Sequence, residues 1–329
     1  PPPSKELFDL RLQRIQQLEE IAKLIWPNAM LRPFGSFVTG LLTSDSDLDL
    51  ALLIPPADLE EYIGPKDDVI QLLKGMQEEI NDRMTRNQGL ACVISARVPV
   101  LKIPASSSSS FSIDIVCQAD GIVSSGLIRD FLSLDARVFS VAHAVKIFTK
   151  QIQVSGTVDN FLAPYAFTLS LINYLQGVVS PPVLPWIHIM DTTGATESPP
   201  PPADFDVNSS NYQLREIEYS ADGKKVAWFF PSTWHSENTL SSEELFLSFL
   251  HWFGCEFNWN TQAICIREGH PISRSSSWRM KSNPCVVEDP FQPPRNITRA
   301  VFDTTLRMTT QAFCDAYLMV ANSKCEEEE

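Results

Sequence analysis

Three aspartates stand within or beside short apolar runs, where carboxylates are unusual. Asp47 and Asp49 are two residues apart at the start of LDLALLI, and Asp114 lies between Ile113 and Ile115. Side chains two apart in a strand project from the same face, so Asp47 and Asp49 point together, and Asp114 faces out while its neighbours enter the core. A carboxylate in an apolar strand is costly unless a cation neutralises it. The trio therefore predicts a site for Mg²⁺ or Mn²⁺, which prefer hard oxygen ligands.

A glycine–serine pair upstream adds a second chemical feature. Gly35 lets the backbone approach a phosphate closely, and Ser36 opens a short helix whose N–H groups point at it. Two metal ions about 3.5–4 Å apart can activate an attacking oxygen and neutralise a leaving phosphate. A lone D-x-D is usually a solvated turn, and a lone Gly-Ser is usually a helix start. The combination with a third strand-centred aspartate favours catalysis.

The apolar periodicity predicts the elements that must position these residues. Helical spacing covers 5–25, 67–88, 124–133, 135–151, 164–178, 241–253 and 298–321, and strand-like runs cover 31–34, 48–54, 91–95, 98–103, 111–116 and 226–230. The fold class is therefore α+β: a mixed sheet with helices, followed by a mainly helical domain. Residues 180–240 are rich in Pro, Ser, Asp and Asn, which predicts a long irregular insertion.

The composition excludes several classes of protein. The chain has 329 residues and a formal net charge of -14, so it does not grip nucleic acid by bulk positive charge, although a local basic cleft stays open. Residues 160–190 lack Asp, Glu, Lys and Arg, but their prolines and amides favour a buried helix over a membrane span. Seven widely spaced cysteines without a C-x-x-C pair are expected to be reduced thiols, and the five histidines form no zinc pattern.

The segment FGSFVTGLLTSDSDLDLALLI resembles the signature of the DNA polymerase β-like nucleotidyltransferases. Within them it is most similar to the noncanonical poly(A) polymerases and terminal uridylyltransferases. The resemblance extends through 96–103, 123–131, 145–151, the segment around Tyr165 and 287–299, which leaves out 180–240. The small size is most similar to the minimal uridylyltransferases of trypanosome mitochondria, including the editosome-associated member. The resemblance implies a polymerase β-like catalytic domain and a helical domain, with the nucleotide in the cleft between them.

The resemblance assigns roles residue by residue. It implies two Mg²⁺ or Mn²⁺ ions on the catalytic carboxylates Asp47, Asp49 and Asp114. The implied triphosphate contacts are Gly35, Ser36, Ser46, Lys146 and Lys150; the implied ribose and base contacts are Ser124, Ser125, Tyr165, Asp289, Gln292 and Arg295; and the implied RNA contacts are Arg97 and Arg299. Lys146 and Lys150 are four apart on one helix face, which suits a phosphate clamp or equally two solvated lysines. Tyr165 is either a stacking ring or a buried core tyrosine.

Three positions depart from the family pattern and leave base choice open. Pro164 stands where relatives have a serine, Gln292 where they have a glutamate, and Arg295 where a histidine often decides between uracil and adenine.

The expected function is template-independent transfer of UMP from UTP to RNA 3′ ends with release of pyrophosphate. The alternatives are an ATP-using poly(A) polymerase and an inactive scaffold subunit of an RNA-processing complex. We expect the catalytic domain to comprise 1–123 with 300–325, and the base-recognition domain 124–299. By resemblance alone, we expect editosome-like protein partners and a mitochondrial location, and we expect no membrane association.

Overall fold

The computed structural model describes residues 4–59, 66–83, 90–96, 98–106, 110–156, 159–190, 211–219, 225–274 and 283–327. It divides into two compact units, Pro1–Arg129 with Glu216–Val226, and Asp130–Arg215 with Ala227–Glu329. Within the described residues, no helix has the length and apolar character that a membrane crossing requires.

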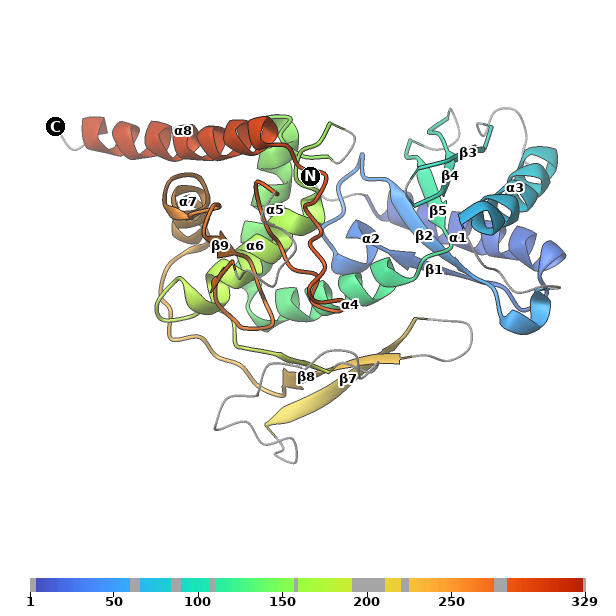
Figure 1. The fold of residues 1–329 in the computed structure, drawn as a ribbon, viewed down its shortest axis with the longest axis horizontal. Helices are drawn as coiled ribbons and strands as arrows, with labels where there is room; N and C mark the ends of the chain where they lie inside the picture. Colours follow the sequence, from blue (N-terminus) through green and yellow to red (C-terminus); the bar gives the residue numbers. More distant parts are fainter. Residues whose placement is uncertain are drawn as a thin grey trace. The chain divides into compact units, whose positions relative to one another are not determined.

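The first unit is built on a mixed five-stranded sheet (Figure 1). Its elements are α1 (Lys5–Ile25), β1 (Met30–Phe34), α2 (Ser36–Thr39), β2 (Leu48–Leu53), η1 (Pro56–Asp58), α3 (Lys66–Arg83), β3 (Cys92–Ile94), β4 (Val100–Ile103), β5 (Ile113–Val116) and α4 (Asp120–Leu134), which continues into the second unit. The strand order is β1-β2-β5-β4-β3. Only β2 and β5 are parallel among the paired strands of this sheet whose register is resolved.

One face of this sheet carries the core. Alternate residues of the three central strands are buried with α1 and α3 in a single apolar cluster: Leu48, Leu50, Leu52, Leu101, Ile103, Ile113 and Ile115. Burying each such side chain contributes about 1.5–3 kcal/mol. Because side chains alternate between faces, this burial puts Asp49, Lys102 and Asp114 on the opposite face.

The second unit is mainly helical. Its elements are α5 (Ala136–Gln151), α6 (Pro164–Gly177), β6 (His188–Met190), most of β7 (Tyr212–Glu218) and β8 (Lys225–Pro231), α7 (Ser242–His251), the π-helical turn η3 (Trp252–Glu256), β9 (Gln262–Ala263), β10 (Ile272–Ser273) and α8 (Asp303–Glu327). The end of β7 and the start of β8, within Glu216–Val226, are assigned to the first unit. Phe313 of α8 is fully buried, and its ring packs on Phe148, Phe167 and Phe253. The aromatic residues of α5, α6 and η3 thus share one core with α8.

The position of α8 differs from the expected domain division. We expected 300–325 to join the catalytic domain, but α8 belongs to the second unit because Phe313 is anchored in its aromatic core. The described part of 180–240 also differs from the expected irregular insertion. It forms the strands β6, β8 and β7, which pair in that order, and β8 includes the predicted strand 226–230.

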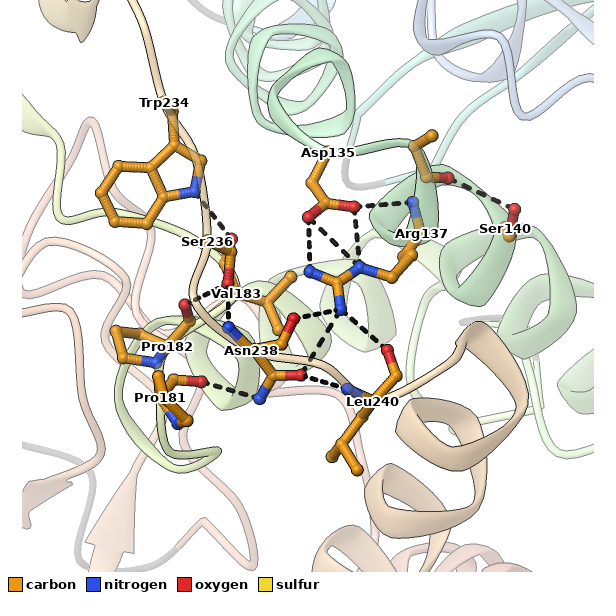
Figure 2. A network of polar contacts seen from close by, with 11 residues as sticks. Asp135, Arg137, Ser140, Pro181, Pro182, Val183, Trp234, Ser236, Asn238 and Leu240 are labelled. Atoms are coloured by element: carbon orange, nitrogen blue, oxygen red, sulfur yellow. Dashed lines mark hydrogen bonds and ion pairs between the residues drawn. The ribbon is translucent and has the colours of Figure 1, made fainter.

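A polar network joins the start of α5 to the segment after β8 (Figure 2). Arg137 pairs with the N-cap residue Asp135 at 2.7 Å and donates to the carbonyl oxygens of Asn238 and Leu240 at 2.8 and 2.7 Å. Asn238 in turn donates to the Pro181 carbonyl at 2.8 Å. These bonds fix the end of the insertion against the helical unit.

The expectation that all seven cysteines are reduced is wrong for one pair. Cys255 and Cys314 form a disulfide with a Cα–Cα distance of 5.6 Å, which lies in the range that the bond needs. The pair is 59 residues apart in sequence and meets because η3 packs closely on α8. A Cβ added at Gly254 would lie 2.7 Å from the Thr310 carbonyl oxygen.

Candidate active site

The sheet register brings the second and third aspartates together. Asp49 of β2 lies directly beside Asp114 of the parallel strand β5. On the other side of β5, Lys102 of β4 is the register partner of Asp114. Both carboxylates are partly exposed. Asp49 and Asp114 therefore project from the same face of the sheet, whereas Asp47, expected to lie in the strand with Asp49, precedes β2.

Gly35 lies against Asp49 in a position that only glycine fits. Its φ is +66°, and a Cβ there would stand 2.3 Å from Asp49 Oδ2. The chain reaches this position because Phe34, the last residue of β1, pairs with Asp49. Ser36 follows as the first residue of α2 and is partly exposed. The Gly-Ser turn and the Asp49 carboxylate therefore form one local site.

Ser125 of α4 holds this turn in place. Its Oγ accepts a 2.6 Å hydrogen bond from the Gly35 N–H and donates at 2.7 Å to the Gly121 carbonyl. The side chain is 4% exposed. In the structure this hydroxyl holds the Gly35 turn, and a nucleotide contact for it stays a prediction. Ser124, its neighbour, is partly exposed, and its nucleotide contact stays a prediction.

Lys102 is the cation of the carboxylate site. Its Nζ lies 2.8 and 3.0 Å from the two Asp114 carboxylate oxygens. Burial acts to lower the pKa of Lys102, but the hydrogen bond and the attraction of Asp114, Asp47 and Asp49 outweigh it and raise the pKa. The ammonium group offsets the repulsion between carboxylates on adjacent strands.

Asp47 precedes β2 and is exposed. It accepts a hydrogen bond of 2.5 Å from Ser112 Oγ, just before β5. The preceding loop is closed by Ser46, whose Oγ accepts from the Thr43 N–H at 3.0 Å and contacts Thr43 Oγ1 at 2.7 Å. Because Ser46 is 7% exposed, its hydroxyl shapes this loop in the structure. A triphosphate contact for it stays a prediction.

The donor set suits a hard divalent cation. The carboxylates of Asp47, Asp49 and Asp114 provide only oxygen ligands, as Mg²⁺ and Mn²⁺ prefer. Within the described ranges, no three His, Cys, Asp or Glu side chains are already gathered tightly enough to enclose an ion. Lys102 engages both oxygens of Asp114, and Ser112 engages Asp47. A bound cation would take over the neutralising role of Lys102.

The second unit carries the two predicted phosphate lysines and the remaining predicted base contacts. Lys146 is half-buried and Lys150 is exposed on α5, four residues apart as expected. Burial, and next the charge of Lys146, lower the pKa of His143 on the same helix. Tyr165 is partly exposed in the first turn of α6, with Pro164 at the helix start, a place that suits proline.

A loop after β10 gathers three of the predicted base contacts. Arg295 Nη1 donates to Gln292 Oε1 at 2.7 Å and lies 3.5 Å from Asp289 Oδ2. The Asp289 carboxylate is mostly buried and also accepts from the Phe291 N–H at 3.0 Å. The loop closes through the 2.8 Å bond from Asp289 N–H to the Arg295 carbonyl, so the three side chains lie together. Their role as base contacts stays a prediction.

The insertion supports this loop from the side. Trp228 of β8 is fully buried and packs on Phe291 with ring centroids 6.1 Å apart. Its Nε1 donates to the buried Asp130 carboxylate at 3.0 Å. Sequence reasoning left Trp228 out because nothing in the insertion points to a distant helix or loop.

The structure does not test the two predicted RNA contacts. Arg299 is exposed, and Arg97 lies outside the described residues, so both RNA contacts stay predictions. Lys102 was missed as a site residue, although a lysine between Leu101 and Ile103 in VPVLKI is a signal of the same kind as an aspartate in FSIDIV.

Comparison with known proteins gives matches over both units. Residues 2–133 match the model of the mitochondrial-like poly(A) RNA polymerase central palm domain, and residues 244–295 match the model of the Cid1 family poly A polymerases. Rat poly(A) RNA polymerase GLD2 is 25% identical over 87% of this chain, and Arabidopsis thaliana protein HESO1 is 27% identical over 94%. The chain spans 55% and 60% of the lengths of these two relatives.

Solved structures show the same fold. Cid1 in complex with its short product ApU has a TM-score of 0.75 and 22% identity, covering 97% of this chain and 90% of that one. A crystal structure of the Cid1 poly(U) polymerase has a TM-score of 0.73 at 22% identity, covering 96% of this chain and 88% of that one. The expected α+β fold, a mixed sheet with helices joined to a mainly helical unit, is confirmed by the likeness to these structures.

Proposed function

We propose that this chain is a nucleotidyltransferase of the noncanonical poly(A) and poly(U) polymerase family, and that it adds UMP from UTP to RNA 3′ ends without a template. The two family-model matches and the similarity to GLD2 and Cid1 support the proposal. The observation that carries the proposal is the register of β2, β5 and β4. It sets Asp49, Asp114 and Lys102 side by side, with Gly35 against Asp49.

The proposed cofactor is a pair of Mg²⁺ or Mn²⁺ ions on Asp47, Asp49 and Asp114. When bound, they supply charge neutralisation for the attacking RNA 3′ oxygen and the leaving pyrophosphate. Solved structures of the Cid1 poly(U) polymerase include complexes with Mg 3′-dATP and with MgGTP. The polypeptide itself positions the groups: the Gly35 turn admits a phosphate, and Ser125 and Ser112 hold the turn and Asp47 in place. No covalent enzyme intermediate is needed.

Three aspects of the carboxylate site argue for a catalyst over the inactive scaffold. All three carboxylates are present, two are in register, and Lys102 compensates their charge. A chain that only bound partners would have no need to keep like charges together at this cost.

The choice of UTP over ATP rests on the loop Asp289–Arg295. An ionised Asp289 can only accept, which suits the uracil N3–H. The Arg295 bond to Gln292 Oε1 directs the Gln292 NH₂ group away from Arg295, and amide and guanidinium donors complement the uracil carbonyls. Adenine presents an amino donor where uracil has O4, so this donor-rich group opposes it.

An ATP-using polymerase is the second candidate, and one observation favours it. The GLD2 relatives are named poly(A) RNA polymerases, whereas the Cid1 neighbours are described as poly(U) polymerases. The similarity to GLD2 and Cid1 therefore leaves both nucleotides open, and base choice depends on the loop.

Extension of a labelled RNA with each of the four NTPs separately tests the proposal. We expect extension with UTP, with a higher kcat/KM than for ATP. The variant Asp289→Ala should lower the UTP-to-ATP ratio of kcat/KM, since a site built on hydrogen bonds leaves groups unpaired with the wrong base. If no NTP supported extension, the inactive-scaffold alternative would be favoured. A higher kcat/KM for ATP than for UTP would favour the poly(A) polymerase alternative.

Cellular context is proposed on resemblance alone. We keep a mitochondrial location and editosome-like partners as predictions, tested by imaging the tagged full-length protein and by identifying proteins that co-purify with it.

A further inference from the structure

Arg11 is an arginine buried in the core of the first unit. It lies on α1, where Leu7 and Ile15 are its neighbours four residues away on the same face, and its side chain has 0% exposure. A buried guanidinium is costly unless it has hydrogen bonds and a countercharge. Its contacts therefore show what keeps it there.

Arg11 touches the two segments that lead into the carboxylate strands. Its Nη2 donates at 2.8 Å to the carbonyl oxygen of Ser46, the residue before Asp47. Its guanidinium carbon lies 4.3 Å from the ring centroid of Phe111, a stacking contact that favours a cation. Phe111 directly precedes Ser112, which donates to Asp47 at 2.5 Å.

The countercharge for Arg11 is Asp47 of the carboxylate site. In the part of the chain that the structure describes, its Nε and Nη1 atoms are buried without a hydrogen-bond partner, so no carboxylate pairs with them directly. Burial lowers the pKa of the guanidinium, and attraction to Asp47 opposes this. Arginine stays charged in proteins, so a full positive charge sits behind the Asp47 loop.

We propose that Arg11 is a positioning residue of the carboxylate site. It joins the loop before β2 to the segment before β5, so that Asp47 and Asp114 are held at a fixed separation, and it offsets part of the repulsion among the three carboxylates. The inference deepens the proposed function, since it assigns a device that prepares these groups for a divalent cation.

The positioning role of Arg11 can be tested without an activity assay by measuring the Mn²⁺ affinity of the full chain with electron paramagnetic resonance. Supporting groups behind metal ligands change affinity by about 10- to 100-fold, so Arg11→Met should weaken Mn²⁺ binding at least about tenfold. It should also lower kcat for RNA extension, with the KM for UTP little changed. Arg11→Lys keeps the charge and one donor but not the planar stacking, so we expect a smaller loss of about threefold in both quantities.

Arg14→Met is the matched control. Arg14 is also buried on α1, but it donates to Gln17 at 2.7 Å on the same helix, and its loss should leave Mn²⁺ affinity at the parental value. A folded Arg11→Met with parental Mn²⁺ affinity and kcat would overturn the inference. If Arg11→Met does not fold, parental values in a folded Arg11→Lys would overturn it. A parent that binds Mn²⁺ but extends no RNA would instead remove the proposed function and leave Arg11 as a positioning residue for the metal site.

Discussion

Replacing Asp114 by asparagine should separate catalysis from stability. The change keeps the shape of the side chain but removes one of two negative charges that lie side by side on β2 and β5. It also removes the charge partner of Lys102. The two effects on the free energy of unfolding oppose each other, because repulsion and attraction are lost together.

The structure bounds the stability change. The side chains of Lys102 and Asp114 are 35% and 25% exposed, and pairs that reach solvent contribute about 0–1 kcal/mol. The free energy of unfolding in the absence of metal should therefore change by less than about 1 kcal/mol. Transfer should fall by about 10³-fold or more, which corresponds to roughly 4 kcal/mol of transition-state stabilisation, because two carboxylates cannot hold both ions.

Two assays run in parallel on the parent and on Asp114→Asn. Extension of a labelled RNA gives kcat/KM, and thermal unfolding with and without Mg²⁺ gives the metal linkage. A parent with Mg²⁺ at ten times its Kd should gain about 1.4 kcal/mol, and the variant should gain much less. Asp315→Asn on α8 is the control, since Asp315 is exposed and accepts from Gln311 on the same helix.

Near-normal transfer by a folded Asp114→Asn would refute the catalytic assignment. A loss of transfer with unchanged Mg²⁺ stabilisation would refute the metal reasoning, because Asp114 would then act without holding the ion.

Three further outcomes are expected. Lys146→Ala and Lys150→Ala should each raise the KM for UTP severalfold, with kcat nearly unchanged, as loss of charge-assisted phosphate contacts predicts; unchanged nucleotide kinetics in both would make them solvated surface lysines. Trp228→Phe should remove a hydrogen-bond donor from the buried Asp130 and lower the free energy of unfolding by about 1–3 kcal/mol. It should also shift the UTP-to-ATP ratio of kcat/KM, because Trp228 packs on Phe291. Trp252→Phe is the control, since Trp252 packs on Tyr174 instead, and it should leave that ratio unchanged. Arg137→Ala should lower stability by about 2–3 kcal/mol in denaturant titrations, since it bonds the Asn238 and Leu240 carbonyls. The hydrogen bond from Arg137 lowers the pKa of the Asp135 carboxyl. This stabilisation is therefore present above the ordinary pKa of aspartate, about 3.9, and is lost as the pH falls through the folded value. If parent and variant lost stability equally as the pH fell, the pairing would be contradicted.

The sequence by itself determined the elements and the chemical character of the site. Alternation in LDLALLI and FSIDIV sends leucines and isoleucines to the core face, so the aspartates between them have only the other face. Gly35 could be recognised from its place directly before Ser36, as a residue that lets the backbone approach a phosphate closely. These are local rules, which act over two to four residues and need no knowledge of the fold. That a larger residue would meet the Asp49 carboxylate is visible only in the structure.

Only the tertiary structure decided which distant groups meet. Strand order puts Lys102 beside Asp114, and helix packing puts Arg11 behind Ser46 and Phe111. Ser125 faces the Gly35 turn because of the way α4 packs, with Gly121 close against the Phe34 ring. The insertion strand β8 reaches Phe291 across more than 60 residues of sequence. None of these contacts follows from periodicity, because each depends on which surfaces bury one another once the chain has closed its long loops.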